Sequence, residues 1–221
     1  MKALIKYNKG SGNVELRETE EPTRATNQVM LEIAHCGICG TDLHVYHDTF
    51  RNYPPVILGH EFSGKVVDIG SEVKDVQLGD TFSVLGATAV QCGRCEYCER
   101  GEFMFCANRR GMGHGVNGAF TKYAAVRPDQ LFKIPEGVSM EYGALVEPLA
   151  VAVHVVEEVA SFRLGDVVLL SGPGPIGLLC LKMLLAHGLK VIVAGTSDDD
   201  MRLEMARKYG AARTVVVNQE N

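Results

Sequence analysis

Residues 166–195 read DVVLLSGPGPIGLLCLKMLLAHGLKVIVAG. The stretch begins with an apolar run typical of a buried strand and turns at a glycine-rich segment. An apolar helix follows and ends at Gly188, and the stretch ends with a second strand, KVIVA. Downstream, SDDDMRLEMARKYG predicts a capped helix that stops at Gly210, and TVVV predicts a third strand. This alternation of strands and helices predicts an α/β fold with a doubly wound parallel sheet.

The glycine-rich segment GPGPIG fits the pattern GxGxxG, and its place between a strand and a helix makes the match specific. The first glycine permits a tight turn, the second lets the backbone approach a pyrophosphate, and the third lets helix and strand pack closely. The N-terminus of the helix then faces the phosphates. The pattern predicts NAD(P) as a cofactor, bound at Gly172, Gly174, Pro175, Ile176 and Gly177.

The end of the second strand leaves the choice between NAD and NADP open. An acidic residue usually ends this strand in NAD-binding proteins, but here the strand is followed by Gly195, Thr196 and Ser197. Without that acid a 2′-phosphate is not repelled, and Thr196, Ser197 and Arg202 could hydrogen-bond it. Asp198–Asp200 favour NAD if one of them points inward, but acids there also cap a helix.

The first 145 residues have a different texture, with short β-type runs separated by turn residues. They predict an irregular β-rich domain over residues 1–145. Residues 143–159, GALVEPLAVAVHVVEEV, have the apolar spacing of a helix with a proline early in it, and we expect the domain junction there. The second domain then covers residues 146–221. The expected strands of the first domain are at 2–7, 13–18, 29–37, 62–70, 80–85 and 120–126.

Four of the seven cysteines lie in one short segment, with two-residue spacers between the first three, and the odd total argues against a complete disulfide framework. Four thiolates on one loop predict a closed, tetrahedral structural zinc site that stiffens the lobe 92–106. Iron–sulfur ligation is the nearest rival, but there the fourth cysteine typically precedes a proline, and here Ala107 follows. The four predicted ligands are Cys92, Cys95, Cys98 and Cys106.

Three further segments, HCGICGTDLH, GHE and VEP, offer ligands for a second, open metal site. A catalytic zinc needs a few protein ligands of mixed type and one position left for water or substrate. Each segment alone is weak evidence, because a His-Glu pair is usually on the surface and a Glu-Pro pair usually starts a helix. The residues that could supply the site are Cys39, His60, Glu61 and Glu147.

Taken in order, GICGTDLH, PPVILGHEFSGKVVDIG, the four-cysteine lobe, GAFTKYAAV, EPLAVAVH and SGPGPIG resemble zinc-containing medium-chain dehydrogenases over essentially the whole chain. The most similar branch holds sorbitol, xylitol and threonine dehydrogenases. The resemblance implies a GroES-like irregular β-barrel catalytic domain followed by a Rossmann domain. It makes Cys39 and His60 ligands of the catalytic zinc, with Glu61 and Glu147 as the acidic members of that site.

The same resemblance implies a hydride transfer between a substrate carbon and the nicotinamide, with zinc polarising the substrate oxygen. Thr41 would begin the relay that removes the proton. His44 is a candidate next member, although a plain loop histidine is an equal reading. Asp42 would orient the histidine ligand, while Cys36 and Cys180 read as buried thiols without a metal.

Composition narrows the partners. The 221 residues are 46% hydrophobic and carry a formal charge of −5, without a basic block that could neutralise phosphates. Nucleic acid and membrane are therefore not expected partners. A small alcohol or ketone substrate is what the family resemblance implies. Lysines at positions 2, 6 and 9 interrupt any signal-peptide core, which indicates a cytoplasmic protein. The family resemblance implies a homo-oligomer for the full-length form.

The leading hypothesis is an oxidoreductase acting on a secondary alcohol of a polyol or sugar alcohol. An L-threonine 3-dehydrogenase-like activity is an alternative, although that branch tends to carry Asp-Pro where this chain has Glu147-Pro148. A second alternative is a C-terminally truncated, inactive zinc-binding fragment, because the chain ends at Asn221, soon after its third parallel strand. Quinone reductase relatives are set aside, since they lack the four-cysteine lobe.

Overall fold

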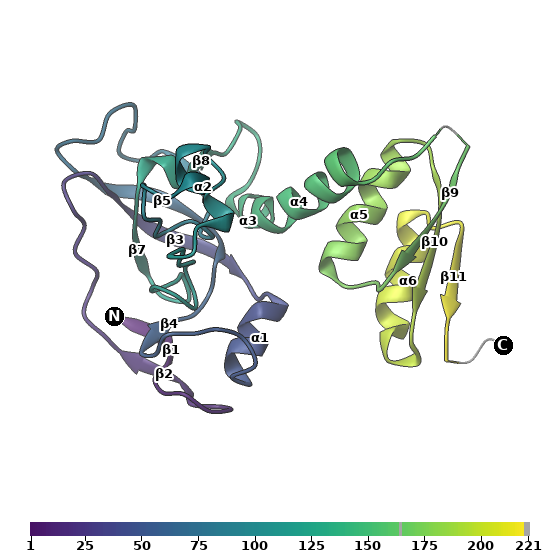
Figure 1. Ribbon diagram of the computed structural model, residues 1–221, viewed down its shortest axis with the longest axis horizontal. Coiled ribbons are helices and arrows are strands. Elements are labelled where there is room, and N and C mark those ends of the chain that lie inside the picture. The colour runs from purple at the N-terminus through teal and green to yellow at the C-terminus, as the bar shows by residue number, and fades with distance from the viewer. Residues whose placement is uncertain (164, 219–221) are drawn as a thin grey trace. The chain divides into compact units, whose positions relative to one another are not determined.

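The computed structural model describes residues 1–163 and 165–218 and divides into two compact units, Met1–Glu147 and Pro148–Asn221. Each unit has its own hydrophobic core. Figure 1 shows the N-terminal unit in purple to teal, and the C-terminal unit in green to yellow. Among the described residues, no helix is both long enough and apolar enough to cross a bilayer.

The N-terminal unit is built from two antiparallel sheets. A five-stranded sheet has the order β7-β3-β5-β6-β8, and a three-stranded sheet has the order β2-β1-β4. Val29, Leu31 and Phe62 on the two longest strands are fully buried and centre the core. The strands are β1 (Lys2–Lys6), β2 (Val14–Glu18), β3 (Val29–Gly37), β4 (Val56–Ile57), β5 (Glu61–Ile69), β6 (Thr81–Val84), β7 (Tyr123–Val126) and β8 (Leu131–Lys133).

All six strands expected in this unit are confirmed, with ends displaced by a few residues at most. The sequence pattern missed β4 and β8, which are too short for an apolar alternation to show. It also missed the short helices, of which α1 matters most for the site. The short helices are α1 (Gly40–Tyr46), α2 (Glu96–Glu99) and α3 (Met140–Ala144), with single 3₁₀ turns η1 (Phe103–Phe105) and η2 (Pro128–Gln130).

The helix expected over residues 143–159 is not one regular helix. It is divided into α3, α4 (Val146–Val153) and a π-helical segment, η3 (His154–Val159). Pro148 has no backbone N–H to donate to the carbonyl four residues earlier. This explains why α3 ends at Ala144 and a new helix begins two residues before the proline.

The C-terminal unit is a three-stranded parallel sheet in the order β11-β10-β9, and this confirms the alternation predicted from residues 166–195. The two helices that connect its strands, α5 (Pro175–Ala186) and α6 (Asp200–Tyr209), lie on the same side of the sheet in Figure 1. Pro175 occupies the first position of α5, where its missing N–H costs nothing. The elements are β9 (Val167–Ser171), α5 (Pro175–Ala186), β10 (Lys190–Gly195), the 3₁₀ turn η4 (Ser197–Asp199), α6 (Asp200–Tyr209) and β11 (Arg213–Val216).

Candidate active site and metal centres

The helix α1 presents the first candidate ligand at its N-terminus, because Cys39 is its N-cap residue. The buried carboxylate of Asp42 accepts a hydrogen bond from the backbone N–H of Cys39 at 2.9 Å. Its second oxygen accepts one from the backbone N–H of Gly59 at 3.2 Å. Asp42 therefore joins the two chain segments that carry Cys39 and His60.

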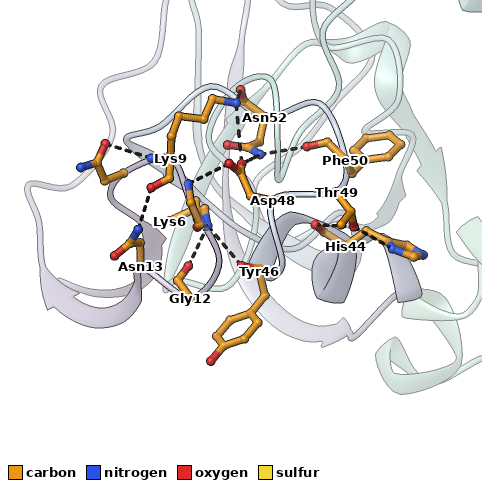
Figure 2. A network of polar contacts seen from close by, with 12 residues as sticks. Lys6, Lys9, Gly12, Asn13, His44, Tyr46, Asp48, Thr49, Phe50 and Asn52 are labelled. Atoms are coloured by element: carbon orange, nitrogen blue, oxygen red, sulfur yellow. Dashed lines mark hydrogen bonds and ion pairs between the residues drawn. The ribbon is translucent and has the colours of Figure 1, made fainter.

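The other end of α1 is held by an unusual residue, the fully buried Lys6 of β1. Its ammonium group donates to the carbonyl oxygens of Gly12 at 2.7 Å and Tyr46 at 3.2 Å, and also to that of Gly10 (Figure 2). Tyr46 is the last residue of α1, so a positive charge meets the negative end of the helix dipole there. Both ends of α1 are thus fixed to the β-sheet framework.

Three of the four predicted catalytic-site ligands come together. The ligand atoms of Cys39, His60 and Glu61 all lie within 4.8 Å of one another, although β5 and α1 are far apart in sequence. Glu147 does not belong to this group, but it lines the adjoining pocket. A thiolate, an imidazole and a carboxylate at this spacing form a donor set that suits a zinc ion with an open position.

The surroundings of His60 favour a positive charge. Its Nδ1 atom is buried, lies 3.6 Å from Oδ1 of Asp42 and has no hydrogen-bond partner among the described residues. Burial by itself lowers the pKa of His60. The Asp42 carboxylate and the Cys39 thiol raise the pKa by more than burial lowers it, so the net pKa is about 10. The Asp42 carboxylate, which favours a proton on the imidazole, would also favour a metal cation bound to it.

A pocket of about 140 Å³ adjoins these ligands in the N-terminal unit. Burial raises the pKa of Glu147, which favours its neutral form, whereas nearby His60 acts in the opposite direction. A larger cavity of about 370 Å³ in the same unit contains none of the candidate ligands, so we assign it no role in catalysis. The small pocket is lined by Thr41, Phe50, His60, Ala87, Arg109, Met112, His114 and Glu147.

Sequence reasoning missed Phe50, Arg109 and His114, which share no ligand spacing with the motifs. The ring of His114 stands edge-on to that of Phe50, with centroids 5.1 Å apart. Burial, together with the positive charges of His60 and Arg109, lowers the pKa of His114 to about 4. A neutral imidazole therefore lines the pocket at neutral pH.

The four cysteines of the lobe 92–106 also come together, with all sulfur atoms within 4.8 Å. Sγ of Cys92 lies 3.9 Å from Sγ of Cys98. Four sulfurs at about 2.3 Å from a tetrahedral zinc would be roughly 3.8 Å apart, so the geometry fits the ion. Cys98 and Cys106 are the buried residues of the lobe, while Met104 and Phe105 are exposed. The lobe has almost no apolar core of its own.

Of the remaining predicted residues in the N-terminal unit, Thr41 lines the pocket, whereas His44 and Cys36 do not. His44 does not line it, because its exposed ring lies on the outer side of α1, with Nδ1 3.2 Å from Oγ1 of Thr49 (Figure 2). Cys36 lies outside the ligand group, and burial raises the pKa of its thiol to about 12. Cys36 is therefore a neutral thiol.

In the C-terminal unit the glycine turn has the geometry that a phosphate-binding loop requires. Gly172 has φ of +91°, in the left-handed region that favours glycine. A Cβ atom on Gly177 would lie 2.1 Å from the carbonyl oxygen of Gly172, so only glycine fits there. A Cβ atom on Gly174 would meet no protein atom within 4 Å, which leaves that approach open to a ligand. Pro175 and Ile176 open α5 directly after it.

The candidate 2′-phosphate ligands at the end of β10 already have protein partners. The carboxylate of Asp199 accepts hydrogen bonds from the hydroxyl of Thr196 at 3.1 Å and from Arg202 at 3.3 Å. Ser197 accepts a hydrogen bond from the side chain of Asn218 at 2.9 Å. Asp199 occupies the N-cap position of α6 without a side-chain capping bond, and its carboxylate instead accepts a further hydrogen bond from the backbone N–H of Thr196 at 3.1 Å.

Comparison with known proteins agrees with this architecture. Residues 25–136 match the alcohol dehydrogenase GroES-like domain. Sorbitol dehydrogenase of Halalkalibacterium halodurans is 39% identical, over 95% of this chain and 61% of that protein. D-arabitol-phosphate dehydrogenase of Enterococcus avium is 35% identical, over 96% of this chain and 60% of that protein.

Among solved structures, a zinc-binding dehydrogenase from Sinorhizobium meliloti, bound to NADP, superposes with a TM-score of 0.91 at 33% identity. The match covers 100% of this chain and 63% of that one, so the chain spans about three fifths of the length of these relatives. The matches confirm the predicted fold class, a GroES-like domain followed by a partial Rossmann sheet. The chain belongs to the alcohol dehydrogenase GroES-like family, and its relatives include a sorbitol dehydrogenase and a zinc-binding dehydrogenase.

Proposed function

We propose that this chain carries the catalytic centre of a zinc-dependent oxidoreductase that transfers a hydride between a secondary alcohol, of a polyol or sugar alcohol, and NAD(P). The observation that carries the proposal is the convergence of Cys39, His60 and Glu61 within 4.8 Å beside a pocket that contains Thr41. The names of the relatives, a sorbitol and an arabitol-phosphate dehydrogenase, support a polyol as substrate.

Cys39, His60 and Glu61 would hold the catalytic zinc, and Glu147 would act from the pocket wall. Because Nδ1 of His60 faces Asp42, its Nε2 is the nitrogen left for the metal. A bound zinc ion supplies Lewis acidity, which lowers the pKa of a substrate hydroxyl. The chain's own contribution is to fix the donor set, because Asp42 joins the segments that carry Cys39 and His60.

Thr41 would receive the proton that the alcohol releases, because it carries a hydroxyl and lines the same pocket as His60. We propose that the proton then passes to His44, one turn further along α1. The exposed ring of His44 suits a last member of the relay, since it can exchange its proton with water.

The NAD(P) pyrophosphate would lie at the turn formed by Gly172, Gly174 and Gly177. Gly174→Ala is expected to leave the thermal unfolding temperature unchanged and to weaken NAD(P)H binding at least about 10-fold, because the new methyl group meets only the ligand. Gly177→Ala should instead destabilise the fold by about 2 kcal/mol, because its Cβ would overlap a carbonyl oxygen. Fluorescence titration and thermal denaturation of the two variants separate these effects, and equal behaviour of the pair would contradict the assignment.

We propose that the residues at the end of β10 favour NADP over NAD. Gly195→Asp is expected to shift the ratio of the two dissociation constants towards NAD by about 10-fold, since a carboxylate there repels a 2′-phosphate. A Cβ atom at this position would lie 3.1 Å from the ring of Pro173 and 3.2 Å from Leu203, so Gly195→Ala is the matched control for crowding. A ratio that is the same in both variants would show that NADP is not favoured here.

The test of the proposed reaction is reduction of NAD and NADP, followed at 340 nm, with a panel of polyols, sugar alcohols, their phosphates and L-threonine. Turnover with polyols that is abolished by His60→Ala supports the proposal. Turnover with L-threonine alone, or zinc-loaded protein that binds NAD(P)H but turns over none of the panel, would contradict it. We further propose a cytoplasmic location, which is supported by seven cysteines that form no disulfide among the described residues. A homo-oligomer is proposed from the family resemblance alone.

A further inference from the structure

One arginine lines the candidate active-site pocket and two more pack on a neighbouring tyrosine, and none of the three has an acidic partner among the described residues. Arg109 lines the pocket itself. Arg51 and Arg110 both contact the ring of Tyr53, with their guanidinium carbons 5.1 Å and 3.5 Å from its centroid. The backbone N–H of Tyr53 donates to the carbonyl oxygen of His114 at 2.9 Å, and this bond connects the arginine pair to the pocket wall.

The charges of these arginines are not neutralised within the part of the chain that the structure describes, where Arg51, Arg109 and Arg110 form no ion pair with a carboxylate. Arginines elsewhere on the same unit do, as Arg24 does with Asp68 at 2.6 Å. Arg109 and Arg110 are also half-buried, so water screens them less than a surface residue.

Most of the N–H groups of the Arg109 guanidinium are available to a ligand. Arg109 donates one hydrogen bond to the carbonyl oxygen of Ala87 at 3.0 Å, while its guanidinium has five N–H groups. The guanidinium fork matches the oxygens of a phosphate bidentately. A phosphate monoester carries about −1.5 to −2 charges at pH 7, which two of the three guanidinium groups would neutralise.

We propose that the substrate of this site is a polyol phosphate, with its phosphate monoester bound by Arg109 and assisted by Arg51 and Arg110. The inference rests on the proposed function, because the reacting hydroxyl must lie at Cys39 and His60 at the same time. It narrows that function to a phosphorylated substrate, whose charged end determines which polyol is accepted. The arginines bind and orient the substrate and take no part in the hydride transfer.

The experiment is isothermal titration of the zinc-loaded protein with sorbitol 6-phosphate, sorbitol and inorganic phosphate, which needs no turnover. We expect sorbitol 6-phosphate to bind about 10- to 100-fold more tightly than sorbitol, as one to two charge-assisted contacts allow. Arg109→Gln should remove most of this difference. Arg127→Gln is the matched control, because Arg127 also donates to nearby backbone carbonyls but pairs with Asp129.

Equal binding of sorbitol and sorbitol 6-phosphate, or a preference that survives in Arg109→Gln, would overturn the proposal. Weaker NADPH binding in Arg109→Gln, with substrate binding unchanged, would assign the arginines to the cofactor phosphate and would also overturn it. If sorbitol 6-phosphate binds through Arg109 but no polyol or polyol phosphate is oxidised, the phosphate site stands and the proposed reaction fails. The two inferences can therefore fail separately.

Discussion

Replacing Cys39 with serine is expected to remove the catalytic zinc and to lower kcat/KM by at least about 10³-fold. A serine hydroxyl is a poor zinc ligand at neutral pH, and the two remaining donors, His60 and Glu61, cannot hold the ion alone. The Lewis acidity of the ion is worth several kcal/mol of transition-state stabilisation, and each 1.4 kcal/mol or so is a factor of ten in rate. Zinc content and NAD(P) reduction, measured on the same preparation, check both effects.

Cys36→Ser is the matched control, because Cys36 lies three residues earlier on β3 and outside the ligand group. It should keep both zinc ions and most of the activity. Loss of zinc from both variants would indicate that the region unfolds when either thiol is removed. Full activity of Cys39→Ser would exclude Cys39 as a ligand.

The second large effect is expected at the four-cysteine lobe, where Cys98→Ser should release the structural zinc and lower the thermal unfolding temperature by more than about 10 °C. Metal binding to structural zinc peptides is worth on the order of 10 kcal/mol, and 1 kcal/mol shifts the midpoint of a protein of this size by about 2–4 °C. Apolar packing contributes little to the stability of this lobe, because its buried residues are the zinc ligands Cys98 and Cys106 themselves.

Cys180→Ala is the control for loss of a thiol, because Cys180 is buried in α5, far along the chain from the lobe. It should keep the full zinc content and show only the modest loss of a small core side chain. Limited proteolysis adds a local measurement, with cleavage within residues 92–106 appearing in Cys98→Ser alone. An unchanged zinc content in Cys98→Ser would contradict a structural site at this lobe.

Much of the fold could be predicted because its signals are local. The long strands β3 and β5 and the buried strand β10 carry apolar runs that need no distant partner to be recognised. The glycine turn is similar, since Gly172 and Gly177 occupy positions where the backbone itself excludes other residues. Element type and order follow from such patterns.

Parts of the site could not be predicted because they depend on contacts between distant segments. The helix α1 has seven residues and buries a carboxylate, Asp42, so it shows no apolar face that a pattern could detect. Arg109 and His114 reach the pocket only because the chain folds back on Tyr53 and Ala87. No spacing rule connects these residues to the ligand motifs.

The most direct test of the two metal sites is the amount of zinc per chain in the unmodified protein, measured by elemental analysis together with X-ray absorption at the zinc edge. We expect two zinc ions per chain, one with mixed sulfur, nitrogen and oxygen ligands and one with sulfur ligands alone, at Cys92, Cys95, Cys98 and Cys106. A single zinc ion with an all-sulfur shell, in protein that was never exposed to a chelator, would contradict a catalytic metal at Cys39 and His60.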